Sequence, residues 1–199
     1  MDELRGFNIQ IKDNFLNQKD FDKIKSYAKN IAWNPINLGY DEKNPHHVWF
    51  TENCSEEISN LLSKEVSKFF KVEILKVVTC QYSLVAKSKK TEVHNDGGGE
   101  HNFQTIIYIE GDENIHCGTG FYTKKEDNSF NLNTHVGLKP NRIVSWVSGT
   151  YHAPLSFTDD FKSRISIITQ YKITKQAQED NEKLKNENIT MDSRLDRPA

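Results

Sequence analysis

The feature that most limits the fold of this chain is a change of hydrophobic period at residue 72. From there to residue 172, apolar side chains fall in short runs rich in β-branched and aromatic residues, with Gly, Asn, Asp and Lys between them. The runs are VEILKVVTCQYSLVAKS, TEVHND, FQTIIYIEG, TGFYT, SFNLNTHVGL, RIVSWVS and RISIITQYKI. Because no helical pattern separates them, they predict an all-β barrel or sandwich.

The residues before this β-rich part carry helical patterns. After a strand-like entry over residues 7–11, apolar side chains at helical spacing predict an amphipathic helix from about Gln18 to Ala32. Residues 34–53 contain two prolines and a glycine and are predicted to form a loop. A second helix is predicted from Ser55 to Phe70, with Ser55 as its N-cap. The two helices are expected to support the β-rich core.

A length of 199 residues predicts one domain with a tail. We expect the domain to span residues 1–172, with helical support over 1–71 and the β core over 72–172. Residues 173–199 are charged and nearly lack apolar side chains, which predicts a polar C-terminal tail, partly helical or disordered. Homodimerisation through residues 175–195 is an alternative role for this segment.

Charge and cysteine usage narrow the class of protein. The net charge of −2 creates no global field toward nucleic acid or an anionic membrane. Cys54, Cys80 and Cys117 are odd in number and lack CxxC spacing, which indicates reduced thiols in the cytoplasm. No run approaches 18 apolar residues, and the first ten residues lack a signal-peptide core. We therefore expect a cytoplasmic protein, and its richness in Lys and Asn suggests a bacterial or phage origin.

The chemistry of the chain centres on the sequence VHND. His94 and Asp96 are two residues apart in a strand-like context, so both side chains point the same way and can ligate one metal ion. His152 follows the apolar run RIVSWVS and is the third candidate ligand, because a jelly roll brings distant strands together. Two histidines and one carboxylate on one face leave three coordination positions open, as in the facial triad of non-haem Fe(II) oxygenases.

A buried arginine points to the co-substrate. In SRISIITQY, Arg164 and Ser166 share one face of an alternating, largely apolar strand. An inward-pointing arginine is unfavourable unless it meets an anion, and a guanidinium binds a carboxylate through two hydrogen bonds. Arg164 therefore predicts a dicarboxylate with one end on the metal and the other on Arg164. The competing interpretation is a structural ion pair with an acidic side chain of the chain itself.

His94-x-Asp96, His152 and Arg164-x-Ser166 together resemble the Fe(II)/2-oxoglutarate-dependent dioxygenases, in particular their prolyl-4-hydroxylase-like branch. The segments QTIIYIEG and CGTGFYT, the approach LKPNRIVSWVSGTYHAP and the opening IKDNFLNQKDFDKIKSYA are similar to parts of that branch. The resemblance spans roughly residues 7–172, and its specific motifs fall in 82–171. It implies a mainly β (α+β) fold, a double-stranded β-helix (jelly roll) flanked by N-terminal helices.

The resemblance also implies roles for individual residues. His94, Asp96 and His152 would hold Fe(II), and Arg164 would bind the distal carboxylate of 2-oxoglutarate. Tyr108, Tyr82 and Ser166 would complete the pocket of that co-substrate. The implied reaction consumes O2 and 2-oxoglutarate, hydroxylates an aliphatic C–H, and releases succinate and CO2. Peptidyl or free proline is the first substrate that the family suggests.

Several alternatives stay open at this point. The same chemistry on a free amino acid, a small metabolite or a nucleobase is one of them, although the balanced charge gives no nucleic-acid signature. A cupin-like module that binds a metal or ligand without catalysis is the alternative from another class. Trp146 is expected in the core or at its rim. The roles of His46, His47, His101 and His116 are left open.

Overall fold

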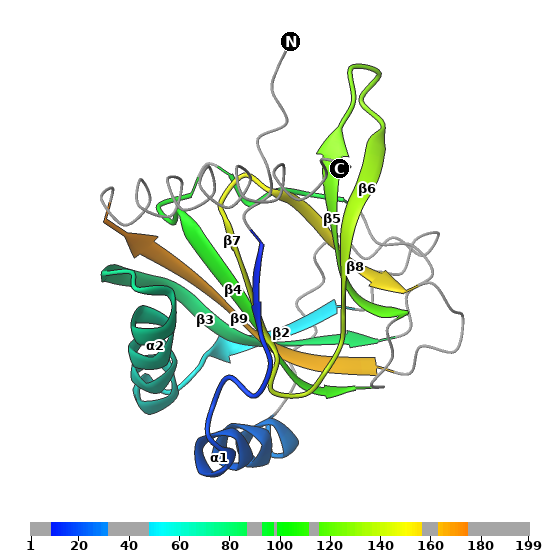
Figure 1. The fold of residues 1–199 in the computed structure, drawn as a ribbon. Helices are drawn as coiled ribbons and strands as arrows, with labels where there is room; N and C mark the ends of the chain where they lie inside the picture. The colour runs from blue at the N-terminus through cyan, green and yellow to red at the C-terminus, as the bar shows by residue number, and fades with distance from the viewer. Residues whose placement is uncertain are drawn as a thin grey trace, which may run out of the picture.

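The computed structural model describes residues 9–31, 48–86, 93–97, 99–111, 116–156 and 163–174, with the backbone alone at 48–52, 86 and 156. Within these residues the chain forms two helices and nine strands, arranged as in Figure 1. In chain order these are β1 Gln10–Lys12, α1 Gln18–Lys29, β2 Val48–Asn53, α2 Glu56–Phe70, β3 Ile74–Ala86, β4 Phe103–Gly111, β5 Cys117–Lys124, β6 Phe130–Gly137, β7 Ile143–Val147, β8 Tyr151–Ser156 and β9 Ser163–Ile173.

The strands form two antiparallel sheets, which confirms the predicted jelly-roll fold. The larger sheet has the order β1-β7-β4-β9-β3-β2, and the smaller one has the order β6-β5-β8. Strand β9, the last described strand of the chain, lies between β3 and β4 near the middle of the larger sheet. Most neighbours in the two sheets are strands that are not consecutive in sequence, as a jelly roll requires; only the pairs β2–β3 and β5–β6 are consecutive.

Both helices pack on the outer face of the larger sheet, where they bury most of the apolar core. Their buried side chains include Phe21 and Ile24 of α1 and Ile58 and Leu62 of α2. They pack in one cluster with side chains of the sheet such as Ile167. The predicted N-cap of α2 is present, since Ser55 accepts from the N–H of Ile58. Helix α1 begins with Asn17 as its N-cap, whose side chain accepts from the N–H of Asp20.

The strand register defines the inner face of the larger sheet. Tyr108 of β4 pairs with Ser166 of β9, and Ser166 pairs with Ser83 of β3, so these three side chains share one face. A second apolar cluster forms between this face and the smaller sheet: Ile106, Tyr108, Phe121, Val136, Leu138, Val144 and Trp146. The sheets therefore enclose an interior that is separate from the core under the helices.

The structure corrects two boundaries. Residues 48–53, predicted as loop, form the edge strand β2, which pairs with β3 from Val48↔Val85 onward. The prolines and glycine that indicated a loop all precede residue 48, while the segment VWFTEN itself suits an edge strand. Helix α1 ends at Lys29, three residues before Ala32, because Asn30 caps it. The tail from residue 175 onward lies outside the described residues.

Ion pairs of Asp13 with Arg142 and Lys139 hold the segment after β1 in place. Asp13 accepts from Arg142 Nε at 2.6 Å and Arg142 Nη2 at 3.1 Å, a two-point pairing, and from Lys139 Nζ at 3.0 Å. Hydrogen bonding from Arg142 is the main cause that lowers the pKa of Asp13 to about 2. Asn141 binds both the N–H and the carbonyl of Leu16, so the same turn holds the entry to α1.

Replacing Asp13 with asparagine is expected to lower the free energy of unfolding by about 1 kcal/mol at pH 7. The full pKa shift would imply a larger loss of unfolding free energy. The Asp13 side chain is 35% exposed, however, so water screens its ion pair and the smaller value is expected. Because the folded pKa lies below the unfolded one, the contribution is present above about pH 4 and disappears as the pH falls toward 2. Urea denaturation of both proteins at pH 7 and pH 2.5 measures this difference. A difference as large at pH 2.5 as at pH 7 would contradict the ion-pair explanation.

Candidate metal centre

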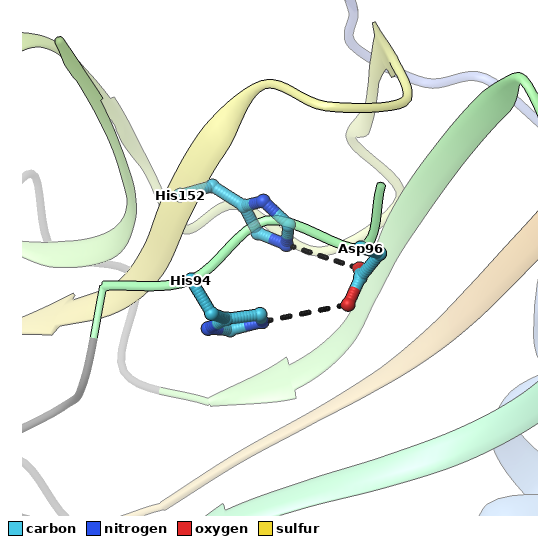
Figure 2. A group of neighbouring side chains, drawn as sticks. All are labelled: His94, Asp96 and His152. Carbon is cyan, nitrogen blue, oxygen red and sulfur yellow. Dashed lines mark ion pairs between the residues drawn. The ribbon is translucent and has the colours of Figure 1, made fainter. Parts of the chain in front are cut away.

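Three side chains that can bind a metal meet at one end of the interior. One ligand atom from each of His94, Asp96 and His152 lies within 4.8 Å of the other two. Asp96 Oδ1 is 3.9 Å from His94 Nε2, and Asp96 Oδ2 is 3.6 Å from His152 Nε2 (Figure 2). These distances suit three ligands around one ion, each roughly 2.0–2.2 Å from it.

The backbone brings the two histidines together. His94 lies outside the named strands but forms an isolated bridge with His152 of β8. The N–H of each residue donates to the carbonyl of the other, at 3.1 Å and 2.8 Å. This single bridge places His94 beside His152 at β8 of the smaller sheet, which explains how ligands 58 residues apart in sequence come together.

His152 is held as a neutral ligand. Its Nδ1 lies 2.9 Å from the carbonyl of Thr150, so an Nδ1–H that donates there leaves the Nε2 lone pair facing Asp96. Burial, and next the neighbouring His94, lower the pKa of His152 to about 4. The rings of Trp146 and Phe121 pack against it, at centroid distances of 4.9 Å and 6.4 Å. His94, at 48% side-chain exposure, faces the open side of the centre.

Asp96 is held by a chain of hydrogen bonds from Trp146 through Gln104, which was not predicted from the sequence. Gln104 Nε2 donates to Asp96 Oδ2 at 2.5 Å, and Gln104 Oε1 accepts from Trp146 Nε1 at 2.9 Å. Gln104 is fully buried. Because an indole N–H can only donate, it fixes which end of the amide faces Asp96. A glutamine within the apolar run FQTIIYIEG is the sequence signal that indicates such a buried polar partner.

Arg164 lies on the same inner face and is buried, with 3% of its surface exposed. Its Nη1 donates to the carbonyl of Gly118, and its guanidinium carbon is 5.7 Å from the centre of the Tyr108 ring. Burial is the main cause that lowers the pKa of Arg164. Within the part of the chain that the structure describes, no carboxylate forms an ion pair with it.

Two buried donors near Arg164 have no hydrogen-bond partner among the described residues: Arg164 Nε and Ser166 Oγ. Tyr108, which pairs with Ser166, is fully buried and hydrogen-bonds Thr119 through its hydroxyl at 2.7 Å. Buried polar groups without partners are uncommon in folded proteins, so this cluster matches the binding site of an anion. A carboxylate would satisfy both donors and the charge at once.

Tyr82 does not belong to this pocket, so its sequence-based assignment is wrong. Its side chain points to the outer face, where the hydroxyl donates to the carbonyl of Ile24 in α1 at 3.0 Å. The register explains this placement. Tyr82 pairs with Ile167, whereas its neighbour Ser83 pairs with Ser166 on the inner face. Tyr82 therefore packs in the core under the helices.

None of the other described histidines belongs to the cluster of candidate ligands. His101 is buried, with 8% of its surface exposed, and its ring lies close to the backbone of Gly99. His116 is exposed and directly precedes β5. His46, His47 and the lysines at 87–90 lie outside the described residues. Trp146 is in the core, as predicted, and also supports the centre through Gln104.

Comparison with solved structures identifies the fold. An oxidoreductase of the 2OG-Fe(II) oxygenase family from Burkholderia pseudomallei is 12% identical, with 83% of this chain and 84% of that chain covered at a TM-score of 0.58. A Pseudomonas putida prolyl-4-hydroxylase is 12% identical, with 86% and 95% covered at a TM-score of 0.53. HygX from Streptomyces hygroscopicus, solved with nickel and 2-oxoglutarate, is 9% identical, with 84% of each chain covered at a TM-score of 0.61.

The chain has the fold of the 2-oxoglutarate/Fe(II) oxygenases. This agrees with the resemblance found in the sequence, although no protein-family model and no curated protein matches the chain. The shared fold spans more than four-fifths of both chains in each comparison. Among the described helices, none is long and apolar enough to cross a membrane.

Proposed function

We propose that this oxygenase-fold protein is an Fe(II)- and 2-oxoglutarate-dependent dioxygenase that hydroxylates an aliphatic C–H. The observation that carries the proposal is the combination, on one interior, of a His94–Asp96–His152 cluster and a buried Arg164 that no described carboxylate pairs with. The cluster of three candidate ligands alone would also suit a structural metal site. A buried arginine alone would suit many different anions. Together they match a dicarboxylate that binds a metal with one end and a guanidinium with the other.

His94, Asp96 and His152 would hold the iron and leave the other coordination positions for co-substrate and O2. Iron bound with 2-oxoglutarate supplies the oxidising chemistry, with succinate and CO2 as co-products. Thr150 and Gln104 keep His152 and Asp96 in one orientation by hydrogen bonds. Arg164 and Ser166 would bind the distal carboxylate, and Tyr108 would shape the wall beside it.

The surrounding side chains would keep water away from the reacting groups. Phe121 and Trp146 are buried and cover His152 from within, while His94 faces the open side. The substrate would therefore approach from the side of His94. A prolyl residue in a peptide is the first substrate to test, since solved neighbours include a prolyl hydroxylase in complex with a peptide fragment. A free amino acid or a small metabolite is the second class to test.

Anaerobic titration with Fe(II) and then 2-oxoglutarate tests the proposal. We expect a visible charge-transfer band in the wild type and none in His152→Ala, because two remaining ligands do not hold the chelate. His101→Ala, which removes a buried histidine outside the cluster, is the matched control and should keep the band. A folded wild type that binds iron without the band would replace the proposal with a non-catalytic, cupin-like metal-binding module.

A further inference from the structure

Two cysteines face each other across neighbouring strands on the outer side of the larger sheet. Cys54 directly follows β2, and Cys80 lies in β3. The N–H of Cys54 donates to the carbonyl of Cys80 at 2.6 Å, and the preceding residue Asn53 pairs with Gln81. Both cysteines pack in the core cluster under the helices, on the face of the sheet opposite to the interior that holds Arg164.

The two thiols have different surroundings. Cys80 is buried, with 2% of its surface exposed, whereas Cys54 is half-buried. The neighbouring Cys80 thiol is the first cause that lowers the pKa of Cys54, against the opposing effect of burial. Donation to Cys54, together with burial, raises the pKa of Cys80. Cys54 also precedes Ser55, the N-cap of α2, where a negative charge is favoured.

We propose that Cys54 and Cys80 form a reversible disulfide in the folded protein, with Cys54 as the thiol that reacts first with a hydroperoxide. The Cys54 thiolate attacks one peroxide oxygen and breaks the O–O bond, which gives a sulfenic acid and releases the other oxygen as hydroxide or, from an organic hydroperoxide, as alkoxide. The Cys80 sulfur then attacks the Cys54 sulfur and forms the S–S bond. The S–O bond of the sulfenic acid breaks, and its hydroxyl group takes the proton of the Cys80 thiol and leaves as water. Two thiols are thereby oxidised and one hydroperoxide is reduced.

The strand pairing suits such a bond. Residues directly opposite in antiparallel strands have Cα atoms about 4.5–5.5 Å apart, within the range of about 4.4–6.8 Å that disulfides span. Cys54 is only half-buried, which gives a small oxidant access to it, and the buried Cys80 lies directly opposite it across the paired backbone. None of the metal-binding side chains takes part, so the disulfide does not depend on the proposed enzymatic function.

Oxidation of the full chain with hydrogen peroxide, followed by alkylation under denaturing conditions and intact-mass measurement, tests the proposal. The chain has three cysteines, so the number of alkylated thiols should fall from three to one, with Cys117 the remaining one. Reduction with dithiothreitol should restore three. In Cys80→Ser, a sulfenic acid should be trapped on Cys54 by dimedone, and in Cys54→Ser no disulfide should form. Cys117→Ser is the matched control, in which alkylated thiols should fall from two to none.

Three outcomes would overturn the proposal. All three thiols could stay alkylatable after oxidation while the protein remains folded by circular dichroism. Cys117 could instead be found in the disulfide by peptide mapping. The bond could also appear only between chains, as a covalent dimer on a non-reducing gel.

Discussion

Replacing Arg164 with methionine is expected to weaken binding of 2-oxoglutarate at least 100-fold and at the same time to stabilise the co-substrate-free protein by about 1–3 kcal/mol. The weaker binding follows from the loss of a buried, charge-assisted pair of hydrogen bonds to a carboxylate. The added stability follows because Arg164 is a buried cation without a described anionic partner, and methionine fills a similar volume without charge.

Two measurements separate these effects. Titration of the iron-loaded protein with 2-oxoglutarate gives the affinity, and thermal unfolding without co-substrate gives the stability, with a gain of roughly 2–4 °C expected per kcal/mol. Arg142→Met is the matched control, since it breaks the contact with Asp13 and should lower the Tm while leaving the affinity unchanged. If Arg164→Met is less stable than the wild type, the Arg164 cluster is part of the structural framework and is not an anion site.

Replacing Gln104 with methionine is expected to weaken metal binding about 10–100-fold, although Gln104 is not among the metal ligands. Methionine keeps the volume but removes the donor to Asp96 and the acceptor for Trp146, so the carboxylate loses its fixed orientation. Trp146→Phe should have a smaller effect in the same direction, because the amide then loses the donor that fixes its orientation.

Anaerobic calorimetry with Mn(II) or Co(II) measures this effect without any need for turnover. Gln170→Met is a matched control, because Gln170 pairs with Gln104 across β4 and β9 but hydrogen-bonds Thr79 instead of Asp96. Equal metal affinities for the wild type and a folded Gln104→Met variant would show that the hydrogen bond to Asp96 does not support the ligand.

Much of the fold and the centre of the site could be predicted from the sequence. Alternation along SRISIITQY places Arg164 and Ser166 on one face of a strand, and the structure buries both on the inner face. The same alternation distinguishes Tyr82 from its neighbour Ser83, because adjacent side chains of a strand point to opposite faces. Ser83 faces the interior and Tyr82 faces the helices, so similarity to the family alone gave the wrong face for this tyrosine.

The remaining features depend on contacts between distant strands. The partnership of Gln104 with Trp146 joins residues 42 positions apart, and it arises only because β4 and β7 pair in register. The contact of Cys54 with Cys80 depends in the same way on β2 pairing with β3, in a segment where prolines suggested a loop. A one-residue change of register would move each of these side chains to the other face of the sheet.

The central position of β9 has a consequence for synthesis of the protein. The chain emerges from the ribosome with its N-terminus first, so β3 and β4 emerge well before β9, the strand that lies between them in the sheet. Until residue 173 has left the exit tunnel, both strands expose unpaired edges that can pair with other nascent chains. The arginine that would recognise the co-substrate lies on β9, the last of the described strands. A polypeptide cut short before residue 163 would therefore lack Arg164 and be prone to aggregate.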